Sequence, residues 1–185
     1  MSVANLPEEE RFSKNIQVLG FLINSCITSL NEAGKTSVSP VIVNLGLAYL
    51  NNLDHHVLIR RFISKTHLEC WDMIHQRNLD FFYNHADKLF SGVPGGNVSL
   101  LKTLFDKNDD GKMLVTDTQI NNLWKNFEAL VRISIKYAHK YSGPVTTADG
   151  EKTYQKKLTN GEDELDIDLL HHAEVWNLTL NYPSE

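Results

Sequence analysis

The chain has 185 residues, 42% of them hydrophobic and 22% charged, which suits one globular domain with a single core. These values exclude collagen-like and wholly disordered chains, and the absence of a run of about 18 apolar residues argues against a membrane span. The net charge of −5 argues against nucleic acid as a partner, because a phosphate-binding surface needs an excess of lysine and arginine.

The N-terminal segment predicts one long amphipathic helix. Pro7, followed by three glutamates, is a start signal, since carboxylates in the first turn meet the positive end of the helix dipole. Gly34 predicts its end. One helical face is apolar at steps of four and three, and it consists of Phe12, Ile16, Leu19, Ile23, Cys26 and Leu30. Phe21 and Leu22 lie off this face, which indicates a central helix.

Further helices are predicted by their start signals. Ser39 and Pro40 open a short, nearly all-apolar segment, for which we expect a helix, with a β-strand from its β-branched residues as the alternative. Asp54 predicts the cap of one long helix that continues to about residue 78. A helix over 79–90 and a short helix near 100–105 follow.

A capping box of Thr116 and Gln119 predicts the start of the last long helix of the bundle, which runs to about Tyr141. The fold class is therefore all-α: a single bundle of about six helices over residues 1–141. Residues 142–185 are predicted to form a polar linker and a C-terminal arm, which ends as a closing helix or a short strand. The apolar residues of this arm are expected to pack on their own bundle or on a neighbouring chain.

The signals for location indicate an intracellular, cytoplasmic protein. The first residues lack the basic start and apolar run of a signal peptide. Cys26 and Cys70 are the only cysteines, and we expect buried thiols in a reducing compartment, with a single disulfide as the alternative.

The loop "DKNDDGKMLVTD", residues 106–117, resembles the calcium loop of the EF-hand family in its first half. The resemblance implies that a calcium or magnesium ion is bound by Asp106, Asn108, Asp110, the Lys112 carbonyl and Asp117, with Gly111 at the sharp turn. The second half departs from the pattern, because Asp117 replaces the closing glutamate and Leu114 offers no side-chain oxygen. These departures favour a polar turn between two helices as the alternative to a metal site.

The eight histidines give no metal-binding spacing. His67 and Cys70 are three apart but have no nearby third and fourth ligand. His55 with His56, and His171 with His172, are neighbours that point about 100° apart on a helix. We interpret these side chains as ordinary helix histidines.

A second, looser resemblance covers residues 60–140. Its spaced aromatic residues, as in "FISKTHLECWDMIHQRNLDFFYNHADKLF", look like those of small helical proteins of unassigned role from large double-stranded DNA viruses. The resemblance implies association with other proteins, including a structural place in a virion, without catalytic residues. Since no P-loop, nucleophile elbow or dinucleotide fingerprint is present, we expect a non-enzymatic protein without a cofactor that acts by protein–protein association, with the arm from Ser142 as the contact element. The alternative is a divalent-cation binder that uses the Asp106 loop.

Overall fold

The computed structural model describes residues 6–36, 39–89, 104, 106–108, 111–141, 155–159 and 164–180. In these ranges the chain is mostly helical, which confirms the predicted all-α class, with one small hairpin added. The helices are α1 (Glu8–Glu32), α2 (Pro40–Asn51), α3 (His55–Thr66), α4 (Cys70–His75), α5 (Leu79–Leu89), α7 (Asp117–Tyr141) and α8 (Leu169–Val175), and the strands are β1 (Gln155–Thr159) and β2 (Glu164–Asp168).

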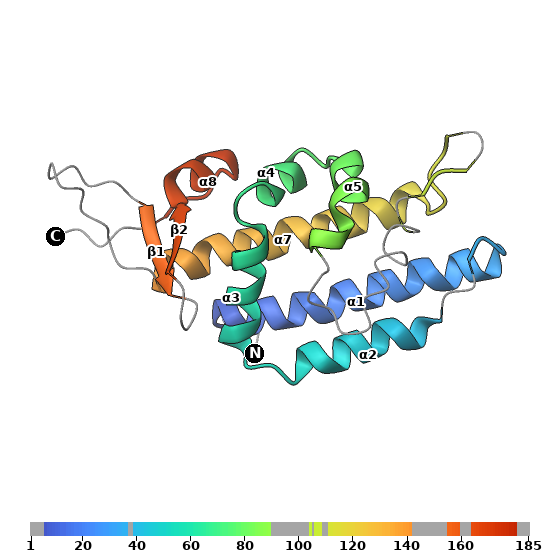
Figure 1. The fold of residues 1–185 in the computed structure, drawn as a ribbon, viewed down its shortest axis with the longest axis horizontal. Helices are drawn as coiled ribbons and strands as arrows, with labels where there is room; N and C mark the ends of the chain where they lie inside the picture. Colours follow the sequence, from blue (N-terminus) through green and yellow to red (C-terminus); the bar gives the residue numbers. More distant parts are fainter. Residues whose placement is uncertain are drawn as a thin grey trace, which may run out of the picture.

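The two long helices α1 and α7 run side by side through the length of the molecule (Figure 1). α2 covers the outer side of α1, and α4, α5 and α8 lie on the opposite side of α7. α3 crosses between these layers and packs on α1. α1 is therefore central, as predicted, because it packs on α2, α3 and α7, and it separates α2 from α7.

The predicted helix starts are present as hydrogen-bonded caps. Ser39 Oγ accepts from the Val41 N–H, and Asp54 Oδ1 accepts from the His56 N–H at 2.9 Å. At α7 the Thr116 N–H donates to Gln119 Oε1 at 3.0 Å, and the Gln119 N–H donates to Thr116 Oγ1 at 3.2 Å. Each cap satisfies N–H groups that have no partner inside the helix.

The ends of three helices share one geometry. At α1 the Lys35 N–H donates to the Leu30 carbonyl at 2.8 Å, across Gly34 with a φ of +66°. This is a Schellman motif, which needs a left-handed residue after the C-cap. Arg77 after α4 and Asn177 after α8 take the same conformation, with φ values of 53° and 49°.

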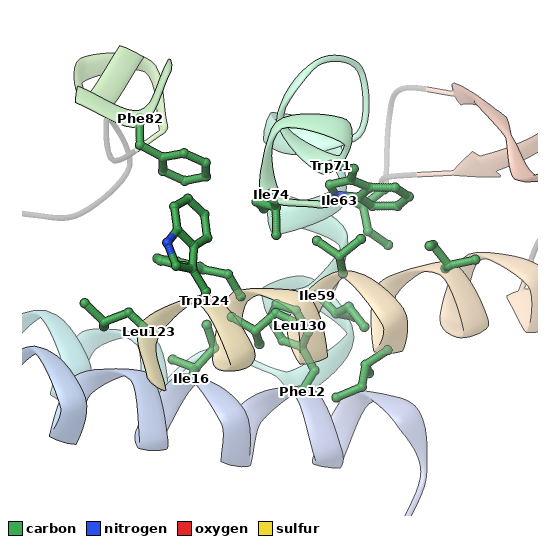
Figure 2. Close-up of a cluster of buried hydrophobic side chains, with 14 of the residues drawn as sticks. Phe12, Ile16, Ile59, Ile63, Trp71, Ile74, Phe82, Leu123, Trp124 and Leu130 are labelled. Carbon is green, nitrogen blue, oxygen red and sulfur yellow. The ribbon is translucent and has the colours of Figure 1, made fainter. Parts of the chain in front are cut away.

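The predicted single helix over 55–78 is wrong, because the chain breaks between α3 and α4. Thr66 Oγ1 donates to the Phe62 carbonyl and accepts from Trp71 Nε1 at 2.9 Å. The indole of Trp71 is fully buried. The break turns Trp71 and Ile74 towards α7 (Figure 2), so core packing overrides the helical periodicity here.

The core lies between α7 and the helices on either side of it. Phe82 of α5 meets Trp124 of α7 edge to face, with ring centroids 5.1 Å apart, and Figure 2 shows these two rings pointing toward one another. On the other side of α7, Phe12 and Ile16 of α1 are buried against Leu130 and its neighbours. Cys26 and Cys70 are buried thiols that form no disulfide, as expected.

The C-terminal arm returns to its own bundle. Trp176 is 1% exposed, and Arg132 of α7 donates to its carbonyl at 2.9 Å. α8 is the predicted closing helix, whereas the strand alternative for residues 175–182 is not found over the described residues up to 180. The β1–β2 hairpin was not expected. Its two strands are antiparallel, with Thr159 opposite Glu164.

Of the predicted short helix near residues 100–105, only Leu104 belongs to the described residues, where it is buried. No helix in the described ranges combines the length and the apolar character that a bilayer crossing requires.

Candidate functional site

An apolar surface covers the outer side of α2 and the neighbouring edge of α1. Several of its large side chains are well exposed, with Phe21 at 71%, Leu45 at 65% and Val41 at 58%. We call this surface the α1–α2 apolar face; it consists of Phe21, Val41, Leu45 and Tyr49. Its α2 residues recur at steps of four, so they lie on one side of the helix.

The packing of α2 on α1 explains why this side is left open. Gly20 provides the space into which the Leu47 side chain fits, and Asn24 Nδ2 donates to Asn44 Oδ1 at 2.8 Å. Leu47 and Asn44 therefore point at α1, and Leu45, about 160° round the helix from Leu47, points away from it. Figure 1 shows α2 at the edge of the molecule, beside α1.

α2 carries no charged side chain: its sequence is PVIVNLGLAYLN. A solvent-facing helix ordinarily presents charged residues on its open side. The sequence predicts a central helix for α1 and a nearly all-apolar helix for α2, and it did not predict that Phe21 and Leu45 would face solvent. The apolar composition of α2 was the signal, but composition alone does not tell a buried helix from an exposed apolar one.

The loop from Asp106 to Asp117 forms a tight turn in its described part. The Asn108 N–H donates to the Lys112 carbonyl at 2.7 Å, and Asn108 Oδ1 accepts from the Lys112 N–H at 2.8 Å. Gly111 has a φ of +74°, as a sharp turn requires. The chain thus reverses direction between Asn108 and Lys112.

The predicted metal ligands of this loop differ in their surroundings. Lys112 offers a carbonyl that already accepts a hydrogen bond from Asn108. Asp117 is the first residue of α7, so the helix begins at the end of the loop. Asp110 lies outside the described residues. Calcium or magnesium binding by Asp106, Asn108, Asp110, Lys112 and Asp117 stays a prediction.

A network of polar side chains joins α1, α3 and α7. Tyr137 Oη lies 3.0 Å from Nδ1 of His56 and accepts from Arg60 Nε at 3.1 Å, and Tyr141 Oη donates to Glu9 Oε1. Burial raises the pKa of Tyr137, while the hydrogen bond from Arg60 opposes the rise. Because these partly buried groups pair with one another, we interpret the network as structural.

Asp72, His171 and His172 lie together in the structure, which their positions in the sequence did not predict. Asp72 of α4 lies beside His171 and His172 of α8, with 3.4 Å between His171 Nε2 and Asp72 Oδ2, and 3.9 Å between His172 Nδ1 and Asp72 Oδ1. One ligand atom from each residue lies within 4.8 Å of the other two. Asp72 and His171 are 99 positions apart, so no short sequence motif could have predicted this cluster.

No family model matches this chain, and neither a curated protein nor a solved structure matches it. The function therefore has to be argued from the geometry above.

Proposed function

We propose that the protein is non-enzymatic and acts by protein–protein association through the α1–α2 apolar face, and that its partner on this face is a second copy of the same chain. The observation that carries the proposal is the exposure of Leu45, Val41 and Phe21 on a helix edge without charge. Exposed apolar side chains that share one side of a helix, as Val41 and Leu45 do, are typical of interaction surfaces.

A second copy fits this face for an electrostatic reason. The chain carries a net charge of −5, so two copies repel each other overall, whereas α2 contributes no charged side chain to the contact. A twofold axis beside Leu45 would place the same apolar side chains opposite each other, and such isologous dimers are the commonest oligomers. Leu45 and Val41 would lose their contact with water.

The size of the α1–α2 apolar face determines the expected affinity of the dimer. α2 has 12 residues, so it is about 18 Å long. With the edge of α1 included, this contact belongs to the small interfaces, and we expect a dissociation constant roughly in the micromolar range. The resemblance of residues 60–140 implies a structural role in a viral particle. We include this role in the proposal because a particle is built from repeated contacts between copies of its proteins.

The C-terminal arm is not the contact element in this proposal. Its apolar side chains, among them Ile167, Leu169 and Trp176, are buried against its own bundle. On the α1–α2 apolar face, Tyr49 accepts a hydrogen bond from Arg61 of α3, whereas Leu45 and Val41 stay 65% and 58% exposed.

Sedimentation velocity over a range of protein concentrations tests the proposal. We expect a reversible dimer for the wild type and a monomer for Leu45→Glu, because the variant places a charge in the centre of the contact. Leu68→Glu is the matched control, since Leu68 is an exposed leucine between α3 and α4, and it should dimerise like the wild type. A monomeric wild type, or dimers of equal strength in Leu45→Glu, would contradict the proposal.

A further inference from the structure

The contact between α4 and α8 contains polar atoms that lack partners. Asp72 Oδ1 and His172 Nδ1 are shielded from solvent, and neither has a hydrogen-bond partner among the described residues. They face each other at 3.9 Å, too far for a hydrogen bond. A buried carboxylate oxygen and a buried imidazole nitrogen are normally paired, so these two atoms indicate a missing ligand.

We propose that Asp72, His171 and His172 bind a Zn²⁺ ion. Zinc takes imidazole nitrogens and carboxylate oxygens at about 2.0–2.2 Å, in tetrahedral geometry. Ligand atoms around such an ion lie about 3.4 Å apart, and Nε2 of His171 is already 3.4 Å from Asp72 Oδ2. The three ligand atoms lie within 4.8 Å of one another, so they have to approach one another by up to about 1.4 Å to reach this spacing. A water molecule would complete the four ligands.

The ligand set favours zinc over calcium or magnesium. Two of the three donors are imidazoles, which suit zinc, whereas the harder ions prefer oxygen ligands throughout. This site is therefore separate in both place and chemistry from the Asp106 loop.

The two histidines have different surroundings, and both suit the site. The side chain of His171 is 49% exposed, which gives an ion a path from solvent. The side chain of His172 is 6% exposed, and its ring packs edge to face on Trp71 with centroids 4.7 Å apart. Trp71 therefore holds the buried ligand in a fixed orientation, which lowers the cost of binding.

Burial also favours the form of His172 that a metal ion needs. It lowers the pKa of His172 below its ordinary value of 6.5, and the charge of Asp72 opposes the shift. A lowered pKa favours neutral imidazole, which is the form that coordinates a metal ion.

A zinc ion here would join two distant segments of the chain. Asp72 follows the break between α3 and α4, whereas the histidines belong to the last helix. The ion would hold α8 against α4, and we expect bound zinc to slow amide exchange in α8.

Calorimetric titration of zinc into chelator-treated full-length protein tests the proposal. The variants are Asp72→Asn and His171→Ala, with His55→Ala as a control because His55 is exposed at the start of α3, outside the group. We expect one ion per chain in the wild type and the control. The affinity should fall in both site variants by at least on the order of 100-fold, since even partners of metal ligands contribute 10–100-fold.

Cobalt(II) binding to the wild type gives a readout that does not depend on how the variants fold. A four-coordinate cobalt site absorbs strongly in the visible region, and a six-coordinate site absorbs weakly. Strong absorption, displaced by one equivalent of zinc, supports the site. The proposal is overturned by weak absorption, by the absence of saturable zinc binding in the wild type, or by equal zinc affinity in the wild type and His171→Ala.

Discussion

Single residues decide how three of the helices end, and only one of those residues is glycine. Gly34 was predictable, because glycine after an apolar run is the usual sign of a left-handed C-terminal residue. Arg77 and Asn177 adopt the same conformation with φ values of 53° and 49°. Their side chains cost free energy there that glycine does not. The sequence did not predict that α4 and α8 would end at these residues. Their left-handed conformation is imposed by the direction that the chain takes after each helix.

Asn177 offers a direct test of this backbone effect, because its side chain is exposed and substitution disturbs little packing. We expect Asn177→Gly to raise the free energy of unfolding by up to about 1 kcal/mol, since glycine tolerates a positive φ. Asn177→Val should lower it by about 1–2 kcal/mol, because a β-branched side chain is strained in this conformation. Urea denaturation measures both. Equal stability of the two variants would show that the left-handed conformation is not limiting.

The calcium affinity predicted for the Asp106 loop also depends on single residues. The shorter Asp117 in place of the closing glutamate predicts weak calcium binding, with a dissociation constant of about 0.1–1 mM. Calorimetry on the wild type and on Asp106→Ala measures it. Heat of binding that disappears in Asp106→Ala would establish the loop as a calcium site, and no heat at millimolar calcium would end the idea.

At the scale of elements, the helices with local start signals could be predicted from the sequence, whereas the break between α3 and α4, which depends on packing, could not. Ser39, Asp54 and the Thr116–Gln119 box each act within one turn of the chain, so short windows of sequence contain all that is needed. The break after Thr66 depends on the burial of Trp71 against a helix far along the chain. The meeting of Asp72 with His171 depends on the same packing.

The close approach of α1 and α2 depends on a residue from each helix, Gly20 and Leu47. A Cβ atom added at Gly20 would overlap the side chain of Leu47. Gly20→Ala should therefore lower the free energy of unfolding by about 1–3 kcal/mol through overpacking, although alanine is the better helix former by about 1 kcal/mol.

The same substitution in a Leu47→Ala background supplies the control. Removing the leucine methyl groups makes room for the new Cβ, so Gly20→Ala should then be neutral or stabilising. Thermal denaturation of the wild type, both single variants and the double variant measures the coupling between the two positions. Additive effects would show that the overlap is relieved elsewhere.

At the scale of the whole molecule, the class of fold could be predicted from helical periodicity, whereas the exposed surface could not. The periodic apolar positions of α1 and α7 correctly indicated the two long buried helices. The sequence did not show that Leu45, or Phe21 off the main apolar face of α1, would face solvent, because exposure depends on which helices cover which faces. The α1–α2 apolar face therefore emerged only from the assembled bundle.

The closing of the C-terminal arm on the bundle also concerns the whole molecule. Trp176 is fully buried at the end of α8 and receives a hydrogen bond on its carbonyl from Arg132 of α7. Trp176→Ala should lower the free energy of unfolding by about 3–5 kcal/mol, because a large cavity forms. Chemical denaturation followed by circular dichroism measures the loss. A loss below about 1 kcal/mol, no more than a typical point substitution, would mean that the arm contributes little to the bundle.

The pairing of α1 with α7 sets an order of events during synthesis. About 85 residues separate the end of α1 from the start of α7, so at roughly 5–20 residues per second the first helix waits several seconds for its main partner. α2 comes directly after α1 in the chain and packs against it through Gly20 and Leu47. The nascent chain can therefore form this local helical hairpin first, and shelter part of α1 from aggregation until α7 leaves the ribosome.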